Sequence, residues 1–154
     1  MPPVTQLYLE DLSVGQVFGS GSLRVEENEI KAFASKFDPQ PFHLDSDAAR
    51  GTFFRELVAS GWHTAAITMR LLVESEFKPV GGIVGAGSDE LRWPRAVRPD
   101  DELRVEGEVL EVRPSKSRPK QGLIKMRVTT LNQNREAVQT MIANLVVPRR
   151  QSSQ

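Results

Sequence analysis

The order of apolar and polar residues changes along the chain from a helical period to a strand period. Residues 16–25 mix Val, Phe and Leu with Gly and Ser, which predicts a strand weakened by its glycines. Residues 26–37 carry apolar side chains at the i, i+3, i+4 and i+7 spacing of one helical face, which predicts a short helix. The apolar positions of that helix are Ile30, Phe33, Ala34 and Phe37.

Two prolines follow this helix. Pro39 and Pro41 each favour extended geometry in the residue before them and lack a backbone donor, so we expect residues 37–44 to form a stiff loop. Residues 45–47 offer capping side chains for a short helical turn that runs through Ala49.

The strongest helical pattern in the chain lies in residues 57–74. Its predicted buried face comprises Trp62, Ala65, Ala66, Met69, Leu72 and Val73. Ile67 and Leu71 extend the apolar surface around the cylinder, so we expect a mostly buried helix. The small residues 59–61 near its start predict a close approach by backbone or by a ligand, with Ser60 as the N-cap.

From residue 83 onward apolar residues alternate with polar ones, which predicts four strands joined by turns. A change of phase predicts a β-bulge near Gly107. The apolar positions of the last strand, which Pro148 ends, are Met141, Ala143, Leu145 and Val147. The 57–74 helix is the only large apolar element able to cover such a sheet. The pattern therefore predicts an α+β fold, an antiparallel sheet of about five strands wrapped around one long central helix.

Composition narrows the class of protein. The 154 residues, 39% of them hydrophobic, suit a single domain over residues 1–154, with polar arms at residues 1–15 and 149–154. The absence of cysteine excludes a disulfide framework, a thiolate zinc site and a cysteine nucleophile. Because 20 basic residues balance 20 acidic ones, no overall field attracts nucleic acid. No apolar run approaches the ~18 residues that span a bilayer, and we expect a cytoplasmic protein that binds no membrane.

The candidate chemistry lies in residues 38–43, which read Asp-Pro-Gln-Pro-Phe-His. A carboxylate and an imidazole on a proline-stiffened loop can point into one space, as acid–base catalysis requires. The alternative is structural, with Asp38 ending a helix and His43 satisfying a backbone carbonyl. On the chemistry of these residues alone, the structural interpretation is the more frequent one.

Residues 33–49, FASKFDPQPFHLDSDAA, resemble the signature of the MaoC-like acyl dehydratases and (R)-specific enoyl-CoA hydratases, D-x-N-P-x-H. Asp38, Pro41 and His43 match it in register, and Gly61 falls on the glycine that opens the family's central helix. Residues 89–100 are similar to the strand that follows that helix. The resemblance implies a hot-dog fold and a hydro-lyase that adds water to, or removes it from, a 2-enoyl thioester.

The resemblance also implies a role for each matching residue. Asp38 and His43 would hold and activate the water, one as base and the other as acid. Gly61 would donate its backbone N–H to the thioester oxygen, a position that suits the positive end of a helix. No metal or redox cofactor is implied, and coenzyme A enters only as part of the substrate.

Three positions depart from the family pattern. Gln40 stands where the signature usually has Asn, and Phe37 replaces the small residue before the Asp. Met69 occupies a helix position where related short-chain hydratases often have Ser. Each change alters the pocket wall or the orientation of the Asp–His pair.

Candidate substrate-binding residues lie beside the catalytic positions and in a basic loop. Those beside the catalytic positions are Gln40, Phe42, Ser60 and Trp62. Arg118 and Lys120, in the basic loop 113–122, are candidates for contact with coenzyme A phosphates, with a solvated surface as the more frequent role of such a loop. His63, on the polar side of the long helix, is interpreted as structural.

The expected partners are an acyl-CoA or acyl-carrier thioester and a second copy of the chain. The family implies a homodimer or a higher oligomer, and an open sheet edge also favours one. Two alternatives to the hydratase stay open: a hot-dog acyl-CoA thioesterase and a non-catalytic acyl-thioester-binding protein. The Asp-Pro-Gln-Pro-Phe-His order argues against the thioesterase.

Overall fold

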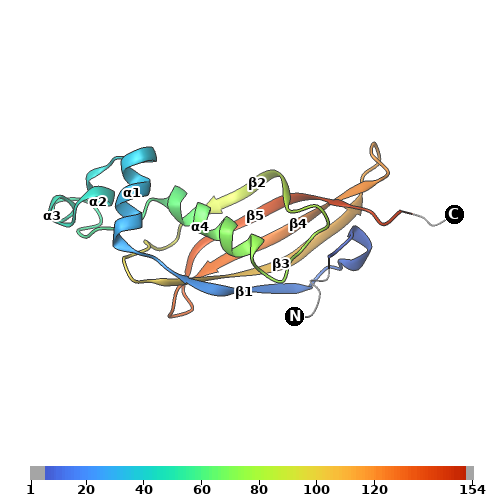
Figure 1. Ribbon diagram of the computed structural model, residues 1–154, viewed down its shortest axis with the longest axis horizontal. Coiled ribbons are helices and arrows are strands. Elements are labelled where there is room, and N and C mark those ends of the chain that lie inside the picture. The colour runs from blue at the N-terminus through green and yellow to red at the C-terminus, as the bar shows by residue number, and fades with distance from the viewer. Residues whose placement is uncertain (1–5, 152–154) are drawn as a thin grey trace.

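The computed structural model describes residues 6–151 and contains one antiparallel sheet of five strands. The strands are β1 (Val17–Arg24), β2 (Val84–Arg92), β3 (Glu102–Pro114), β4 (Gln121–Leu131) and β5 (Ala137–Pro148). The helices are the 3-10 turn η1 (Leu9–Asp11), α1 (Glu27–Phe37), α2 (Pro41–Leu44), α3 (Ser46–Ala49) and α4 (Gly61–Val73). The strand order in the sheet is β1-β3-β4-β5-β2 (Figure 1).

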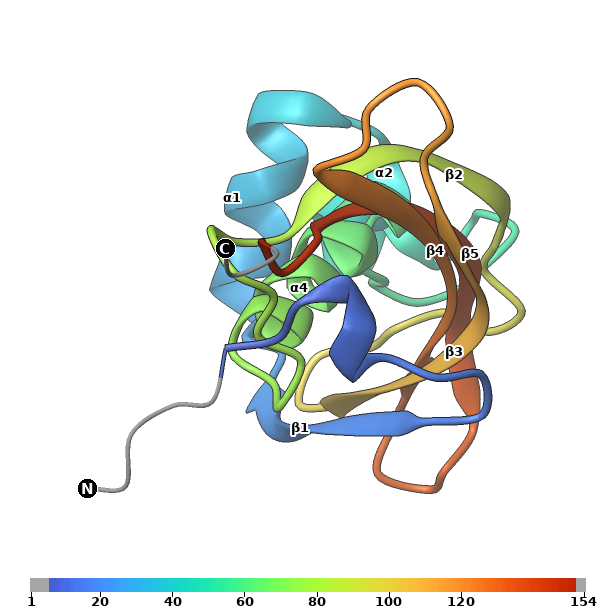
Figure 2. The ribbon, with the colours of Figure 1, turned by 90° about the vertical axis from the view of Figure 1, so that its right-hand side faces the viewer.

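The sheet curves around α4, while α1, α2 and α3 gather at one end of the molecule (Figure 1, Figure 2). The largest fully buried apolar side chains include Ile30, Leu72, Phe77, Leu103, Ile124 and Met126. The predicted α+β fold is confirmed, as are the strand at residues 16–25 and the helix at residues 26–37. Phe37, which was placed on the buried face of that helix, is exposed instead, because it is the last residue of α1 and the chain turns away after it.

Helix α4 begins at Gly61, whereas the apolar pattern placed its start at residue 57. Ser60 caps the helix, since its Oγ accepts the N–H of Trp62 at 3.2 Å. Residues 57–59 are buried but not helical, and the Ala59 N–H donates to the Val97 carbonyl at 2.8 Å. Apolar spacing could not distinguish these residues from a first helical turn. The prediction that Ser60 is the N-cap is confirmed.

The face of α4 that packs on the sheet also differs from the predicted one. Trp62, Met69 and Val73, which the pattern placed inside, are 58%, 41% and 47% exposed. The buried positions are His63, Thr64, Ile67, Thr68, Leu71 and Leu72. The two buried threonines are accepted there because their hydroxyls find partners, as in the 2.6 Å hydrogen bond between the hydroxyls of Thr68 and Thr130. The helix is apolar on nearly every side, so the apolar spacing did not determine which side faces the sheet.

One smaller prediction is wrong and another is confirmed. Residues 41–44 form the helical turn α2 rather than a loop, because proline suits the first position of a helix, where no N–H donor is needed. The β-bulge predicted near Gly107 is present between Val109 and Glu111, where the register with β4 shifts. Gly107 lies in the regular ladder and marks a close contact instead, since a Cβ there would come within 2.7 Å of the Met126 sulfur.

The two ends of the described chain, which the sequence predicted to be polar arms, are joined to each other. The turn η1 inserts the buried side chain of Leu9 into the core. Ion pairs of 3.1 Å and 2.9 Å join Arg149 to Glu10 and Arg150 to Asp11. The remaining parts of the predicted arms, residues 1–5 and 152–154, lie outside the described residues. Between residues 6 and 151, no helix has the length and apolarity that crossing a membrane requires.

Candidate active site

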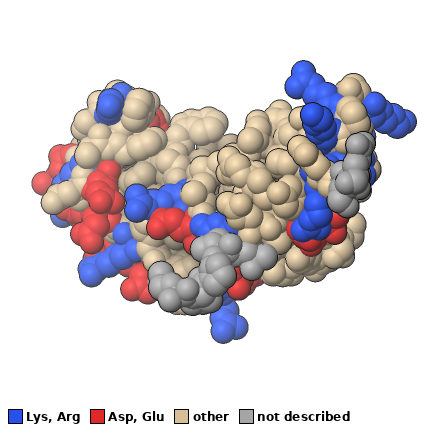
Figure 3. Space-filling view, turned by 45° about the vertical axis from the view of Figure 1, so that its right-hand side comes forward, with Lys and Arg blue, Asp and Glu red and all other residues tan. Residues whose placement is uncertain are grey.

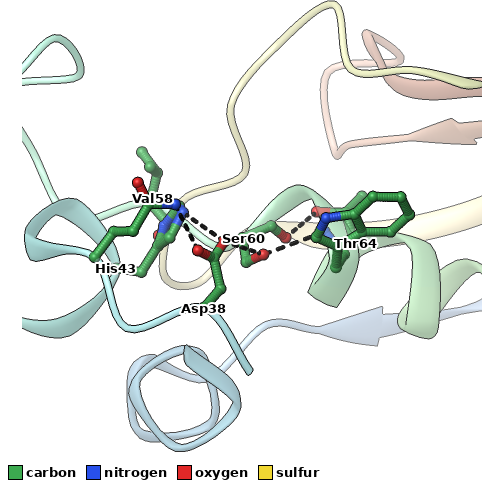
Figure 4. A network of polar contacts seen from close by, with 7 residues as sticks. Asp38, His43, Val58, Ser60 and Thr64 are labelled. Atoms are coloured by element: carbon green, nitrogen blue, oxygen red, sulfur yellow. Dashed lines mark hydrogen bonds and ion pairs between the residues drawn. The ribbon is translucent and has the colours of Figure 1, made fainter. Parts of the chain in front are cut away.

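Three segments meet near the start of α4 and bring a carboxylate, an imidazole and a hydroxyl together (Figure 4). Asp38 is the C-cap of α1, and its N–H donates to the Ala34 carbonyl at 2.9 Å. His43 lies on α2 and is buried, and Ser60 is the N-cap of α4. The tight α2 turn places the imidazole beside the carboxylate, with His43 Nε2 3.3 Å from Asp38 Oδ2.

The carboxylate of Asp38 accepts hydrogen bonds from two side chains. The Ser60 hydroxyl donates to Oδ2 at 2.7 Å, and the Gln40 amide donates to Oδ1 at 2.5 Å. Burial raises the pKa of the Asp38 carboxyl, but these two hydrogen bonds and the charge of His43 outweigh it and leave that pKa below its ordinary value. Asp38 is therefore ionised at neutral pH.

A backbone carbonyl fixes the orientation of His43. Its Nδ1 lies 2.6 Å from the carbonyl oxygen of Val58, which only accepts hydrogen bonds, so we assign the imidazole hydrogen to Nδ1. Nε2 then faces Asp38 as an acceptor when the ring is neutral and as a donor when the ring is protonated. The structural alternative considered from the sequence, in which His43 binds a backbone carbonyl, is therefore correct for Nδ1. It leaves Nε2 available for proton transfer.

The first residue of α4 presents its amide to the same region. Ser60 accepts hydrogen bonds from N–H groups that follow Gly61. The N–H of Trp62 donates to the Ser60 hydroxyl oxygen, and the N–H of Thr64 donates to the Ser60 carbonyl oxygen at 3.0 Å. Among residues 6–151, no acceptor binds the N–H of Gly61 itself. Such unpaired N–H groups lie at the positive end of a helix, where a developing oxyanion is stabilised.

A cavity of about 360 Å³ lies beside His43 and Gly61. Its wall is mostly apolar and includes Phe42, Phe54, Val58, Ala59, Trp93, Ala96 and Val97. Phe42 packs edge-on against His43, with ring centroids 4.5 Å apart. A largely apolar cavity with a few polar groups at one point is typical of a small-molecule site.

Most of the site residues predicted from the sequence lie together. They are Asp38, Gln40, Phe42, His43, Ser60 and Gly61. Gln40 and Ser60 were predicted to bind substrate, but both contact Asp38 and so position the carboxylate. Trp62 does not line the cavity: it is exposed and packs edge-on against Trp93, with ring centroids 5.1 Å apart.

Arg118 and Lys120 lie on the hairpin that joins β3 and β4, at the opposite end of the sheet from α2 (Figure 1). Lys and Arg side chains gather at that end of the molecule (Figure 3). Because β3 contains 13 residues that rise about 3.3 Å each, its two ends are about 40 Å apart. The structure therefore does not bring these two residues to the cavity of their own chain.

Three groups near the cavity were missed by the sequence reasoning. The Val58 carbonyl carries no sequence signal, because every residue has one. The Trp93 indole N–H donates to Oε1 of Gln139 at 2.9 Å. Gln139 is fully buried and lies two residues before Met141 on the same face of β5. The sequence signal for this residue was a polar side chain at a position where the alternation of the strand predicts an apolar one.

The second histidine of the chain lies away from this cavity. His63 is buried and stacks on Phe33, with ring centroids 4.8 Å apart and planes 8° from parallel. Within the described part of the chain, its Nδ1 has no hydrogen-bond partner. Burial lowers the pKa of His63, and the nearby Glu29 opposes this only in part. No three His, Asp or Glu side chains within residues 6–151 are grouped as metal ligands.

The chain is similar in sequence and in fold to known proteins. The family model for the MaoC like domain matches residues 12–132. The crystal structure of the MaoC-like dehydratase from Rhodospirillum rubrum is 57% identical, with a TM-score of 0.91 over 95% of this chain and 99% of that chain. The R-hydratase PhaJ1 from Pseudomonas aeruginosa is 27% identical, with a TM-score of 0.76 over 97% and 93% of the two chains. The uncharacterized protein YdeM of Bacillus subtilis (strain 168) is 35% identical over 125 residues, which cover 81% of this chain and 87% of YdeM.

Proposed function

The chain belongs to the MaoC-like domain family, and we propose that it adds water to, or removes it from, a 2-enoyl thioester, with Asp38 and His43 as the acid–base pair. The hot-dog fold expected from the sequence is confirmed by the Rhodospirillum rubrum dehydratase and the Pseudomonas aeruginosa R-hydratase. One observation carries the proposal. The ionised carboxylate of Asp38, Nε2 of His43 and the unpaired N–H of Gly61 meet at the start of one helix.

In the proposed complex, the acyl group occupies the apolar cavity and its carbonyl oxygen accepts the N–H of Gly61. The cavity volume of about 360 Å³ lies in the range of about 300–1,000 Å³ that small-molecule sites have, so a short acyl chain fits. The attacking water bonds to both the Asp38 carboxylate and Nε2 of His43 from the side of the cavity, since these two atoms are 3.3 Å apart and leave no room for a water directly between them. This geometry holds the water beside the double bond, and it needs no further cofactor.

The proton transfers follow from the charge states of the pair. Ionised Asp38 accepts one proton as the water oxygen bonds to C3, and His43 protonated at Nε2 delivers one proton to C2. The Gly61 N–H stabilises the negative charge that develops on the thioester oxygen between these events. Transfer of a proton from Asp38 to Nε2 of His43 restores the pair, and the sum is the addition of one water. Dehydration runs through the same steps in reverse.

The test is a panel of 2-enoyl-CoA substrates of increasing chain length with the purified protein. We expect loss of the ultraviolet absorbance of the conjugated thioester, without release of free thiol. Thiol release would instead support the acyl-CoA thioesterase. Binding of the substrates without either reaction would support the non-catalytic acyl-thioester-binding protein. Parallel assays with acyl-carrier thioesters decide which carrier is used.

We also propose that the protein is a homodimer or a higher oligomer. Strand β2 forms an edge of the sheet and is exposed along nearly its whole length. Exposed apolar side chains lie on α4 and on β2, namely Trp62, Met69, Val73 and Val84. Soluble proteins usually cover such an edge and such apolar surface. Size-exclusion chromatography with light scattering is expected to give at least twice the chain mass, and a monomer at working concentration would contradict the proposal.

A further inference from the structure

We propose that Trp93 is a specificity-determining residue of this site and that Gln139 is its positioning residue. The inference rests on the proposed function. It states that the indole forms a fixed wall next to the Gly61 amide, and that this wall excludes thioesters carrying a substituent on C2, the carbon bonded to the carbonyl. The preferred substrates are then enoyl thioesters without branching at C2.

The contact between Trp93 and Gly61 carries the first step. A Cβ added to Gly61 would lie 2.6 Å from the two carbons that the indole rings share. The aromatic ring therefore rests directly on the Cα of Gly61, and only a glycine fits beneath it. In the proposed complex, the carbonyl oxygen approaches the Gly61 N–H from the side that the ring leaves open, where Gly61 and His43 line the cavity.

The hydrogen bond to Gln139 fixes that ring. Residues Arg92 and Thr140 are paired between β2 and β5, so the register brings Trp93 next to Gln139. The Gln139 side chain is fully buried, and its Oε1 accepts the indole N–H at 2.9 Å. Among residues 6–151, the only partner of its Nε2 is the Met141 sulfur at 3.9 Å. A buried amide is costly unless it is paired, so the bond to Trp93 is the contact that accounts for a glutamine in this apolar layer.

The exposure of Trp93 shows that the ring is more than core packing. The side chain is 40% exposed although its N–H is tied to a buried residue. One part of the ring covers Gly61, its edge meets Trp62, and the remainder lines the cavity with Phe42 and His43. A rigid, partly exposed aromatic surface of this kind is suited to ligand contact, because little conformational entropy is lost when a ligand packs on it.

The position of the wall predicts what it excludes. The Gly61 N–H binds the carbonyl oxygen, and C2 is one bond from the carbonyl carbon. In the proposed complex, the acyl chain runs from the carbonyl group past the indole that lines the cavity, so a methyl group on C2 would meet the ring. A pocket wall of this type discriminates one methyl group by about 10- to 200-fold.

The decisive experiment compares crotonyl-CoA with its 2-methyl derivative. In Trp93→Ala, the kcat/KM for the 2-methyl substrate relative to crotonyl-CoA is expected to rise at least ~10-fold over wild type. Trp62→Ala is the matched control, because Trp62 touches Trp93 but does not line the cavity, and its ratio is expected to stay within about threefold of wild type. An unchanged ratio in Trp93→Ala, or an equal rise in Trp62→Ala, would overturn the inference.

Two further variants test whether Gln139 positions Trp93. Trp93→Phe keeps a ring over Gly61 but cannot donate to Gln139, and Gln139→Leu leaves the indole N–H without its acceptor. Both variants are expected to lower kcat for crotonyl-CoA more than they raise KM. Both are expected to raise the kcat/KM for the 2-methyl substrate relative to crotonyl-CoA less than Trp93→Ala does. The double variant is expected to match Trp93→Phe, since the lost hydrogen bond is the same one. Additive losses would show that Gln139 does not act through Trp93.

A binding experiment separates this inference from the hydratase proposal. The chain has 2 tryptophans, so Trp62→Phe leaves Trp93 as the only one. Butyryl-CoA, which has no double bond to hydrate, is titrated while emission and calorimetric heat are followed. A saturating emission change at the calorimetric midpoint supports the wall, even if enoyl-CoA hydration fails. Heat without an emission change overturns the wall and leaves the hydratase proposal standing. The absence of both signals with butyryl-CoA and with the butyryl thioester of an acyl carrier would contradict both proposals.

Discussion

His43 and His63 are buried to nearly the same extent, with 5% and 7% of their surface exposed, and each packs against a phenylalanine ring. They differ in what their ring nitrogens meet. His43 has the Val58 carbonyl at Nδ1 and the Asp38 carboxylate at Nε2, whereas His63 has no partner for Nδ1 within residues 6–151. Burial therefore does not mark a histidine as functional. The partners of its two nitrogens decide which atom can exchange a proton.

The largest expected effect tests this contrast directly. Asp38→Asn and His43→Ala are each expected to lower kcat with enoyl-CoA substrates by at least ~10²-fold, because each removes one member of the acid–base pair. His63→Phe is the matched control and is expected to keep kcat within about threefold, since His63 does not line the cavity. Initial rates measure all three variants. A loss in His63→Phe as large as that in His43→Ala would break the comparison.

A smaller effect is expected at Ser60, which both caps α4 and donates to Asp38. Ser60→Ala removes a hydrogen bond that lowers the pKa of Asp38, so that pKa rises. The acid limb of the kcat/KM profile is therefore expected to move to higher pH, because Asp38 becomes protonated sooner as the pH falls. The lost cap is expected to cost about 1 kcal/mol of unfolding free energy. Ser60→Thr, which keeps the hydroxyl, is the control, and an unmoved acid limb in Ser60→Ala would contradict the role.

The pH dependence of the unfolding free energy tests the role of His63 in the folded state. Burial lowers the pKa of His63 from its ordinary value of 6.5, so the unfolded chain takes up a proton at a higher pH than the folded chain. The folded state is therefore expected to lose stability as the pH falls below about 6.5, by about 1.4 kcal/mol for each unit by which the pKa is lowered.

His63→Phe removes that titration. Urea unfolding at a series of pH values is expected to show that the stability of wild type relative to His63→Phe falls toward acid pH. Glu29 is the charged group that acts on His63, and Glu29→Gln is expected to steepen the fall, because its charge favours the protonated ring. Parallel pH curves for wild type and His63→Phe would show that His63 does not change its protonation on unfolding.

The smallest effect is expected from the rings that pack on the two histidines. Phe33→Leu removes the stacking on His63 and is expected to cost about 1 kcal/mol of unfolding free energy without changing kcat. Phe42→Leu, beside His43 in the cavity wall, is expected to raise KM as well. Denaturation curves and steady-state kinetics on the two variants check this, and a change in kinetics for Phe33→Leu alone would reverse the assignment.

The parts of the site that the sequence predicted are the local ones. Asp38 and His43 lie in one short segment whose prolines restrict the backbone, so their spacing alone brought them together. Gly61 was found from the family resemblance, since the apolar pattern placed the start of the helix at residue 57. The β3–β4 and β4–β5 hairpins follow from patterns of the same short range. The expected hairpin between the first two of the four late strands is wrong, because β2 crosses to the far edge of the sheet and pairs with β5.

The parts that were missed depend on distant pairing. Trp93 and Gln139 are 46 positions apart and meet only through the register of β2 with β5. The buried face of α4 was predicted wrongly because hydrogen bonds such as that between Thr68 and Thr130 offset the cost of burying polar groups. Hydrophobic spacing within one helix contains no information about such partners.

The ion pairs of Arg149 and Arg150 with Glu10 and Asp11 hold the first and last described segments at the end of the sheet remote from α2 (Figure 1). Tethering to a bead, or fusion to a second enzyme, is therefore possible at either terminus while the route to the substrate cavity stays open. A linker that pulls on the C-terminus would load the ion pair of Arg150 with Asp11 first, whereas one that pulls on the N-terminus would first load the backbone hydrogen bonds of Leu7 with Lys78 and Val80.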